Sequence, residues 1–233
     1  MKAISVRIRS GAGNKRERRQ RKNDMKEYKN ELKVKIDLGE NLRESIPGLV
    51  KKVIYKTQYL EIQVQKENVT NVLQYLKEAS KFQCKMLLDI ICVDCLNIEE
   101  IKLGRFKMIY VLNSIYNNTR IHVSTYVEHN GIIATISKLY ESGVWLEREI
   151  WDMFGIYFEK HPDLRRILTD YGFVGYPLKK DFPITGYLEV YYDINDKKII
   201  YKPIELMQEY RNYNYGAVWG DYERKVYLDN IIK

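Results

Sequence analysis

The sequence predicts an α+β fold, in which a mixed β-sheet with flanking helices is followed by a long extended C-terminal tail. Apolar and polar residues alternate over several short stretches, which is typical of half-buried strands. Other stretches carry apolar residues at the spacing of an amphipathic helix. From residue 171 onward, Gly and Pro recur too often for a long helix or a central strand. We expect a basic extension over residues 1–35, the α+β domain over 36–160 and the tail over 161–233.

The first part of the predicted domain alternates helix and strand signals. Residues 40–52 predict a short amphipathic helix that a Pro-Gly pair interrupts, and residues 53–65 alternate as one or two strands. Asn68 is a favoured N-cap residue, and the apolar positions after it predict a helix that ends near Phe82.

The second part of the domain consists mainly of strand signals. Residues 86–93 form the longest apolar stretch, which Asp89 interrupts, and residues 86–94 predict a buried strand. Residues 105–115 and 121–129 predict a hairpin, because an Asn-rich turn separates two alternating runs. Residues 135–140 are expected to begin the helical region that follows.

The clearest helix lies after these strands. Leu146, Ile150, Met153 and Phe154 form one apolar stripe at i, i+4, i+7 and i+8. Gly155 stands where a residue in the left-handed conformation would end this helix.

A second, shorter helix is predicted from His161. Pro162 suits the first helical position, and Asp163 is favoured near the positive end of a helix. Residues 164–168 leave room for about one to two turns.

Charged residues of both signs crowd the segment from Glu147 to Asp181, and two interpretations compete. In the first, Glu147, Glu149, Asp152 and His161 are acid–base residues. In the second, the charges form ion pairs that hold irregular backbone, and each buried charge has a partner. The second is favoured, because the sequence shows no nucleophile beside a base, no metal-ligand spacing and no phosphate-binding loop.

Cys84, Cys92 and Cys95 are expected to be free thiols. Cys92 and Cys95 have the two-residue spacing of metal and redox motifs. A zinc or iron–sulfur site needs further ligands, and beyond Cys84 the sequence offers distant histidines alone.

Charge separates the N-terminal extension from the rest of the chain. Residues 1–35 contain thirteen Lys or Arg against four Asp or Glu, whereas the net charge of the whole chain is +8. Such an arm can contact nucleic acid, anionic lipid or an acidic partner, and a solvated or loosely docked tail is the favoured interpretation. Its arginines are also typical of an organellar import signal, although Glu17 argues against one. No apolar run approaches the roughly 20 residues of a membrane span, so we expect none.

The tail is rich in aromatic residues. From residue 171 onward it holds 11 of the 20 tyrosines together with Trp219, and it shows little periodicity. A segment interrupted by Gly and Pro cannot bury so many rings against itself, and Tyr and Trp are favoured at interfaces. We therefore expect the tail to wrap a partner.

The charged segment resembles the signature of a known family. Residues 147–156, EREIWDMFGI, resemble the 30-kDa subunit family of respiratory complex I, the proton-pumping NADH:ubiquinone oxidoreductase. Residues 161–173, HPDLRRILTDYGF, continue the match in the form typical of mitochondrial members. The signature residues, to which the resemblance assigns a structural or interface role, are Glu147, Arg148, Glu149, Asp152, Gly155, His161, Pro162, Asp163, Leu164, Arg165, Arg166, Asp170, Pro177, Lys180, Asp181 and Pro183.

The match also extends into the tail, with departures. Residues 201–211 resemble the tail motif of the family, and the interface anchors that this implies are Glu205, Gln208, Arg211 and Trp219. Lys179 and Tyr191 stand where the family usually has Arg, and a guanidinium and an ammonium are not equivalent hydrogen-bond donors.

The resemblance implies a structural and assembly subunit of the quinone module in the hydrophilic arm of the complex. It implies that the chain clasps the large quinone-site subunit and neighbouring iron–sulfur subunits in a hetero-oligomer, on the matrix side of the mitochondrial inner membrane. No catalytic, cofactor-binding or metal-binding residue is expected here, because FMN, the iron–sulfur clusters and ubiquinone are held by other subunits. The complex is the H⁺-translocating NADH:ubiquinone reductase, and the isolated chain is expected to be inactive.

Two alternatives from other classes remain. A nucleic-acid-binding protein would use residues 1–35, and its binding would fall steeply with salt. A small acid–base hydrolase would use the cluster from Glu147 to His161, and Glu149→Gln would abolish its turnover.

Overall fold

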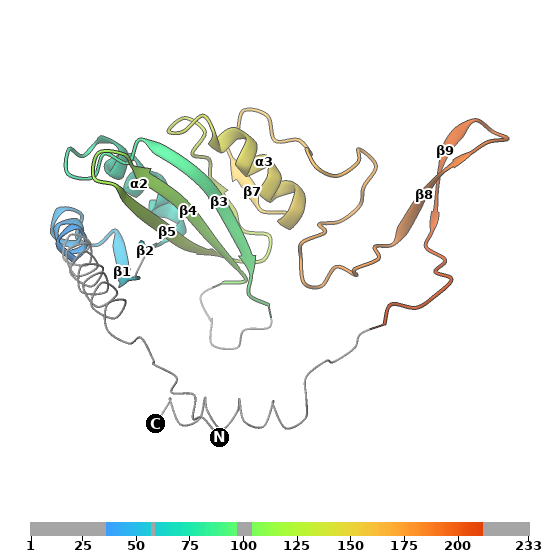
Figure 1. The fold of residues 1–233 in the computed structure, drawn as a ribbon, viewed down its shortest axis with the longest axis horizontal. Coiled ribbons are helices and arrows are strands. Elements are labelled where there is room, and N and C mark those ends of the chain that lie inside the picture. Colours follow the sequence, from blue (N-terminus) through green and yellow to red (C-terminus); the bar gives the residue numbers. More distant parts are fainter. Residues whose placement is uncertain (1–35, 57–58, 97–103, 212–233) are drawn as a thin grey trace, which may run out of the picture. The chain divides into compact units, whose positions relative to one another are not determined.

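The computed structural model describes residues 36–56, 59–96 and 104–211, and these form two compact units (Figure 1). The first unit ends at Phe182 and the second begins at Pro183. The basic extension of residues 1–35 and the predicted anchor Trp219 lie outside the described residues.

A five-stranded mixed sheet lies at the centre of the first unit. The strand order is β1-β2-β5-β4-β3. Strands β2 and β5 pair in parallel, and the other neighbours pair antiparallel. The strands are β1 (Val50–Tyr55), β2 (Leu60–Val64), β3 (Met86–Asp94), β4 (Phe106–Ser114) and β5 (Thr119–Val127). This confirms the predicted α+β class and the β4–β5 hairpin, and the one or two strands predicted over residues 53–65 are two, the first of which begins earlier, at Val50.

Two helices pack their apolar residues on one face of this sheet, namely α2 (Val69–Glu78), which follows the 3₁₀ turn η1 (Lys66–Asn68), and α3 (Gly143–Phe154). Helix α2 begins after Asn68 as predicted, but the Asn68 side chain makes no capping hydrogen bond. Helix α2 also ends at Glu78, earlier than the predicted end near Phe82. Helix α3 ends where the sequence predicts, because Gly155 has the left-handed conformation at φ 75° and donates its amide to the Trp151 carbonyl.

The core follows the alternation of the strands. Inward-facing residues from β2, β4 and β5 meet the buried faces of α2 and α3. The largest fully buried side chains include Tyr110, Phe82, Phe106 and Phe158. The buried residues form one connected cluster, so a single hydrophobic core supports the first unit.

Two predictions around this core are wrong. Residues 36–45 are helical and β1 begins at Val50, so the predicted helix over residues 40–52 is misplaced. Residues 135–140 form turns and not the start of a helix. Their backbone bonds elsewhere: the Thr135 amide donates to the Glu159 carbonyl at 3.1 Å and the Ile136 amide to the Glu147 carboxylate at 2.7 Å. A short parallel pair, β6 (Ile132–Ala134) and β7 (Tyr157–Glu159), brackets α3 instead.

Strand β3 is not fully buried, in contrast to the prediction. Four of its apolar side chains, Met86, Leu88, Ile91 and Val93, are between 39% and 43% exposed. The reason is that β3 is an edge strand and that α3 packs against its other face. An apolar stretch in the sequence predicts a strand, but it does not show whether both faces of that strand are covered by other elements.

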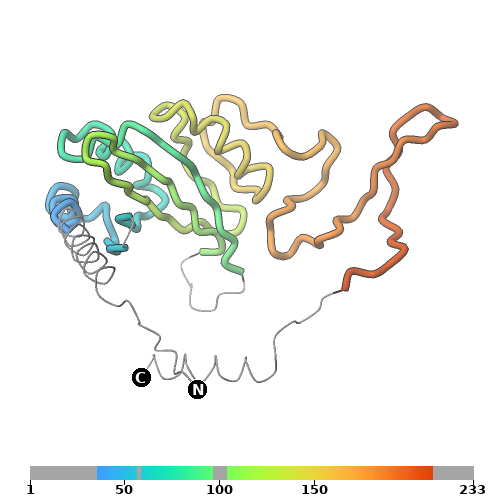
Figure 2. The backbone as a smooth tube through the Cα atoms, viewed as in Figure 1, coloured from blue at the N-terminus to red at the C-terminus, as the bar shows by residue number. Residues whose placement is uncertain are grey.

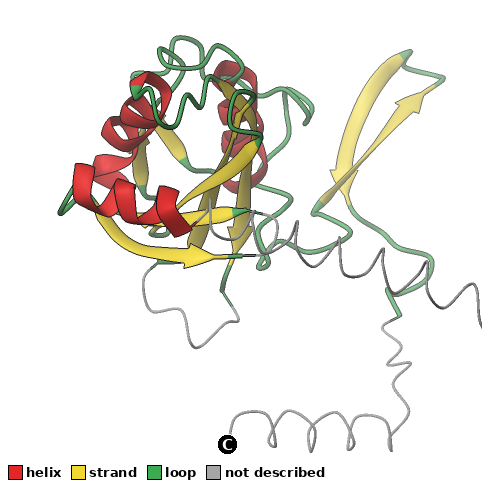
Figure 3. Cartoon of the chain, turned by 60° about the vertical axis from the view of Figure 1, so that its left-hand side comes forward, coloured by secondary structure: helices red, strands yellow, loops and turns green. Residues whose placement is uncertain are grey.

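The second unit contains a two-stranded antiparallel hairpin that the sequence analysis did not predict (Figures 1 and 3). Its strands are β8 (Leu188–Asp193) and β9 (Lys198–Pro203). Among the described residues, no helix is long and apolar enough to cross a membrane.

Candidate functional site

Most of the signature residues lie on α3 or on the long loop of residues 160–182 that follows β7, and Figure 2 shows the path of this loop. We refer to the hydrogen bonds between these two segments as the α3–loop network. Helix α3 contributes three buried charged residues, Glu147, Arg148 and Asp152, of which Arg148 and Asp152 form hydrogen bonds to the loop. Their spacing of one to five residues places them along the part of the helix that faces the loop and the core.

Asp152 is the centre of the α3–loop network. Its Oδ2 accepts hydrogen bonds from the backbone amides of Ile167 at 3.2 Å, Leu168 at 2.9 Å and Thr169 at 2.9 Å. Its Oδ1 accepts the Thr169 hydroxyl at 2.6 Å and the Arg166 guanidinium at 2.9 Å. Burial by itself would raise the pKa of Asp152, but the bonds from Thr169 and the amides outweigh burial and lower the pKa to about 2.

Two arginines hold the carbonyl groups of the same loop. Arg148 donates to the carbonyls of Arg165 at 3.1 Å and Arg166 at 3.3 Å. Arg166 in turn donates to the Gly175 carbonyl at 3.2 Å. The Arg166 guanidinium also lies within 5.8 Å of the ring centres of Trp151, Phe173 and Tyr176.

These contacts explain why the helix predicted from His161 to Leu168 does not form. The segment has no helical residue. The amides of Ile167 and Leu168 are bound by the carboxylate of Asp152, and the carbonyls next to them are bound by Arg148. Side chains on α3 satisfy the backbone groups that a helix would otherwise satisfy. The prediction of this helix was wrong because its local signals could not account for these contacts.

Glu147 lies outside the α3–loop network, because its hydrogen bonds go to residues that precede α3. Its side chain is fully buried and accepts hydrogen bonds from the Thr135 hydroxyl at 2.5 Å and the Ile136 amide at 2.7 Å. Burial raises the pKa of Glu147 to about 7, against the lowering effect of these two bonds.

His161 lies beside Glu147 without forming a hydrogen bond to it. The distance between His161 Nε2 and Glu147 Oε2 is 3.7 Å. Nε2 instead lies 3.1 Å from the Val144 carbonyl, and Nδ1 accepts the Asp163 amide at 3.1 Å. A carbonyl can only accept and an amide can only donate, so Nε2 is the donor and Nδ1 is the acceptor of these two hydrogen bonds.

The structure does not bring all the signature residues together. Glu149, Pro162, Asp163, Arg165 and Asp170 are exposed. Asp163 and Arg165 pair with each other at 2.8 Å on the surface, where the two side chains are more than half exposed. Leu164 packs partly buried against the core.

A second ion pair joins Asp181, one of the signature residues, to Arg105 and Asp94, which were not among the predicted site residues. Arg105 lies between two carboxylates and donates to Asp94 at 2.9 Å and to Asp181 at 2.7 Å. Asp94 also accepts the Lys180 amide at 2.9 Å, so the end of β3 holds the far end of the loop. The hydrogen bonds that Arg105 donates to Asp181 and Asp94 raise the pKa of Arg105. An acid at the end of an apolar strand is the signal that could have pointed to Asp94.

Replacing Arg105 with Lys is expected to lower the free energy of unfolding by about 2 kcal/mol, because an ammonium group cannot bind two carboxylates through parallel bonds. The amide of Lys180 should also exchange its hydrogen faster. Guanidinium-induced unfolding and amide hydrogen exchange measure these two effects.

Asp181→Asn is the control for this prediction. The Asp181 side chain is 51% exposed, so its loss should cost less than about 1 kcal/mol. Equal costs for the two variants would show that Arg105 does not act through the buried Asp94.

The arrangement suits positioning of backbone and does not suit acid–base chemistry on a substrate. The side chains of Glu147 and His161 are both 0% exposed, and Glu149 lies on the surface. The surface cavities described for the chain are lined by other residues.

The described residues contain no group of three or more His, Cys, Asp or Glu arranged to hold a metal ion. Cys84, Cys92 and Cys95 are free thiols, as predicted. Burial raises the pKa of Cys84 to about 12, and it raises the pKa of Cys92 as well. Such thiols are poorly suited to act as nucleophiles or redox groups.

Comparison with known proteins identifies the family. The model described as "Respiratory-chain NADH dehydrogenase, 30 Kd subunit" matches residues 62–188. The chain is 86% identical to NADH-ubiquinone oxidoreductase subunit 9 of Dictyostelium discoideum over 209 residues, which cover 90% of this chain and 100% of that protein. It is 40% identical to subunit 9 of Reclinomonas americana, over 80% of this chain and 90% of that protein.

A solved structure supports the fold. A chain of the membrane-bound sulfane sulfur reductase, an archaeal respiratory membrane complex, aligns with a TM-score of 0.54 and 24% identity, over 64% of this chain and 85% of that chain. The family match and the identity to the two subunits lead to one conclusion: the chain belongs to the 30-kDa subunit family of the respiratory-chain NADH dehydrogenase.

Proposed function

We propose that this chain is a structural subunit without a cofactor in the quinone module of NADH:ubiquinone oxidoreductase. It clasps the large quinone-site subunit and neighbouring iron–sulfur subunits, so that electrons pass from NADH to ubiquinone through groups that those subunits hold. Membership of the 30-kDa subunit family and the names of its relatives support a place in this complex. The buried, backbone-directed charges of the α3–loop network support a role in assembly.

The proposal places the chain on the matrix side of the mitochondrial inner membrane, as part of a proton-translocating assembly. The mitochondrial type of its relatives supports this location. The isolated chain then has no activity, and FMN, iron–sulfur clusters and ubiquinone remain with other subunits. The nucleic-acid alternative rests on residues 1–35, which lie outside the described residues.

The hairpin β8–β9 is the observation that carries the proposal. One of its faces is entirely apolar or aromatic, with Leu188, Val190 and Tyr192 on β8 and Ile199, Tyr201 and Pro203 on β9. The other face carries cross-strand charges: Glu189 binds Lys202 at 2.7 Å, and Asp193 lies opposite Lys198. A two-stranded ribbon is marginally stable in water, and large exposed apolar faces mark interaction sites.

The predicted anchors Glu205, Gln208 and Arg211 follow this hairpin and are exposed. Their role as contacts to a partner stays part of the proposal. Together with the apolar face of the hairpin, they form a candidate surface through which residues 183–211 bind the large quinone-site subunit.

Two neighbouring isoleucines test the proposal as a matched pair. Ile199 lies on the apolar face of the hairpin and Ile200 on the charged face. Ile199→Asp should reduce the share of the tagged chain that enters the large NADH-dehydrogenase assembly at least tenfold, because a buried unpaired carboxylate costs several kcal/mol. Ile200→Asp should assemble almost as the unaltered chain does. Native electrophoresis with NADH-dehydrogenase staining gives the readout, and equal assembly of both variants would contradict a clasp by this face.

A further inference from the structure

The exposed face of β3 is a surface that the fold leaves open. Residues 87 and 90 point into the core, whereas Met86, Leu88, Ile91 and Val93 point outward and are about 40% exposed. The next strand extends this surface, because Ile109 of β4 lies opposite Ile91. We refer to these five outward residues as the β3 face.

The β3 face has a polar border on the same side of the sheet. Toward β2, Lys107 and Glu61 form an ion pair at 2.6 Å, and His122 stacks on Tyr59 with ring centres 3.8 Å apart. An apolar centre with a polar rim is the anatomy of a protein interface.

The edge of β3 is poorly suited to pairing with a further strand. A partner is therefore expected to pack on the face of β3 and not to extend the sheet at its edge. The register shifts between Leu87 and Asp89, which marks a bulge. The Asp89 carboxylate accepts the Ile90 amide at 2.8 Å and so occupies a backbone donor of this strand. Bulges and charged residues are the usual devices that stop strand addition at an edge.

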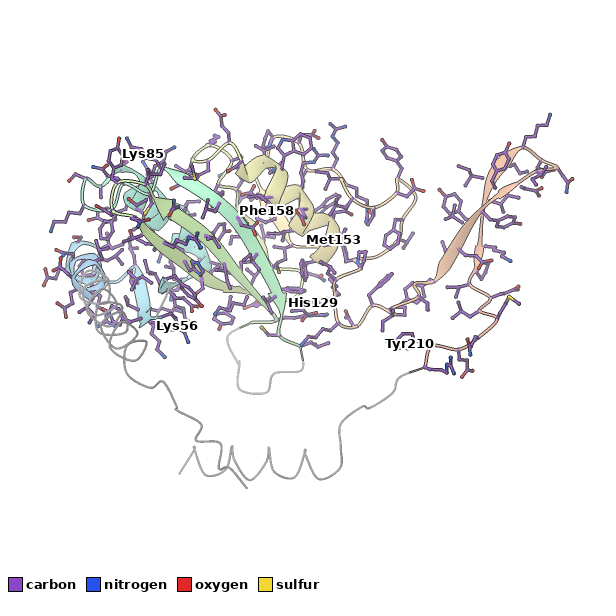
Figure 4. The ribbon with its side chains drawn as sticks, viewed as in Figure 1. Lys56, Lys85, His129, Met153, Phe158 and Tyr210 are labelled. Atoms are coloured by element: carbon purple, nitrogen blue, oxygen red, sulfur yellow. The ribbon has the colours of Figure 1, made fainter. Side chains whose placement is uncertain are left out.

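A basic cavity adjoins the Met86 end of the β3 face. It has a volume of about 530 Å³, and Met86 and Leu87 belong to its lining. Three lysines from separate segments, Lys77, Lys85 and Lys138, also line it. Figure 4 places Lys85 at the end of the sheet opposite His129, so this cavity is remote from the Arg105 ion pair.

The three ammonium groups have no carboxylate partner among the described residues. Lys77 lies 5.1 Å from the centre of the Tyr140 ring, and Lys85 lies 5.7 Å from that of Tyr116. Glu141 is the one acidic residue in the described lining. The lining of the cavity therefore carries more positive than negative charge and lies beside an apolar strip.

We propose that the β3 face and this cavity together bind an apolar segment of a neighbouring subunit, with a carboxylate of that segment in the lysine cavity. The proposal rests on the function proposed above and adds a second contact surface, separate from the hairpin. A protein segment fits better than an anionic membrane surface, because the Asp89 carboxylate lies on the same face and would repel anionic lipid.

Cross-linking within the assembled complex identifies what covers the β3 face. A photo-reactive p-benzoylphenylalanine at position 91 of the full chain is irradiated in the native complex, and mass spectrometry identifies the adduct. A peptide of another subunit with Asp or Glu near its apolar residues supports the proposal. A lipid adduct, an adduct within this chain, a second copy of it, a peptide without an acid or no adduct would overturn it.

Charge variants give an independent readout. Leu88→Asp with Ile91→Asp, and separately Lys85→Glu with Lys138→Glu, should each lower incorporation into the stained assembly at least tenfold. Ile132→Asp is the matched control, since Ile132 is 55% exposed on β6, and it should assemble normally. The lysine pair is exposed, so its replacement tests the surface without disturbing the core. Normal incorporation of the lysine variant overturns the proposal, whereas absence of the unaltered chain from the assembly would instead refute the proposed function.

Discussion

Replacing Asp152 with Asn is expected to lower the free energy of unfolding by about 3–5 kcal/mol. An amide keeps one acceptor oxygen where the carboxylate has two, and its NH₂ group would face donors that have no other partner. Arg166 would also lose its anionic partner at 2.9 Å. Guanidinium-induced unfolding of the full chain measures the loss. Asp163→Asn is the control, and its cost should stay within about 0.5 kcal/mol because the pair with Arg165 is exposed.

Acid gives a second test of Asp152. Its pKa is about 2 in the folded protein, below the ordinary value of 3.8. A lowered pKa means that the stabilisation is complete above about pH 4 and is lost as the pH falls from 4 toward 2. The loss should amount to about 2 kcal/mol, and Asp152→Asn should not show it. An unchanged acid dependence in this variant would contradict the role assigned to the carboxylate.

Glu147 should make the protein less stable as the pH rises. Its pKa is about 7 in the folded protein and 4.5 ordinarily, so the folded state binds the proton more tightly than the unfolded state does. The penalty is absent below about pH 4.5, grows as the pH rises to about 7 and then stays constant at about 3 kcal/mol. Denaturant unfolding at a series of pH values between 4 and 8 measures this change.

The variant Glu147→Gln is the control for this effect. Glutamine keeps an oxygen that can accept the Ile136 amide, but it cannot lose a proton. Its stability should therefore stay almost level between pH 4.5 and 7. A slope equal to that of the unaltered chain would show that another group titrates in this range.

The sequence predicted the elements that local signals control. Helix α3 ends at Gly155 as expected, because its apolar stripe and a glycine at its end are contiguous in the chain. The helix expected after His161 does not form, because contacts from outside the segment decide its conformation. Asp152 and Arg148 bind its backbone from a different element, and no local pattern in residues 161–168 shows this.

The exposure of β3 also depends on the tertiary structure and not on local sequence signals. Its apolar residues indicate a strand, but its place at the sheet edge follows from pairing with β4 alone. The hairpin β8–β9 was missed because Gly and Pro around it suggested extended chain. Its alternation appears once both strands are aligned, when Glu189 meets Lys202 and Val190 meets Tyr201.

The candidate site could be predicted in part. The favoured interpretation, charges that hold irregular backbone, agrees with the contacts of Asp152, Arg148 and Arg166. Arg105 was not singled out as a site residue, because its partners lie far along the chain in Asp94 and Asp181. Partners at such separations are known only from the folded structure.

Isolation of the complex in mild detergent with an affinity-tagged full chain tests the central claim most directly. We predict that the tagged chain migrates on a native gel in a very large assembly that stains for NADH dehydrogenase and contains flavin and iron–sulfur subunits. The purified chain alone should show neither the stain nor a bound cofactor. Migration as a free small protein, or together with RNA, would contradict the account.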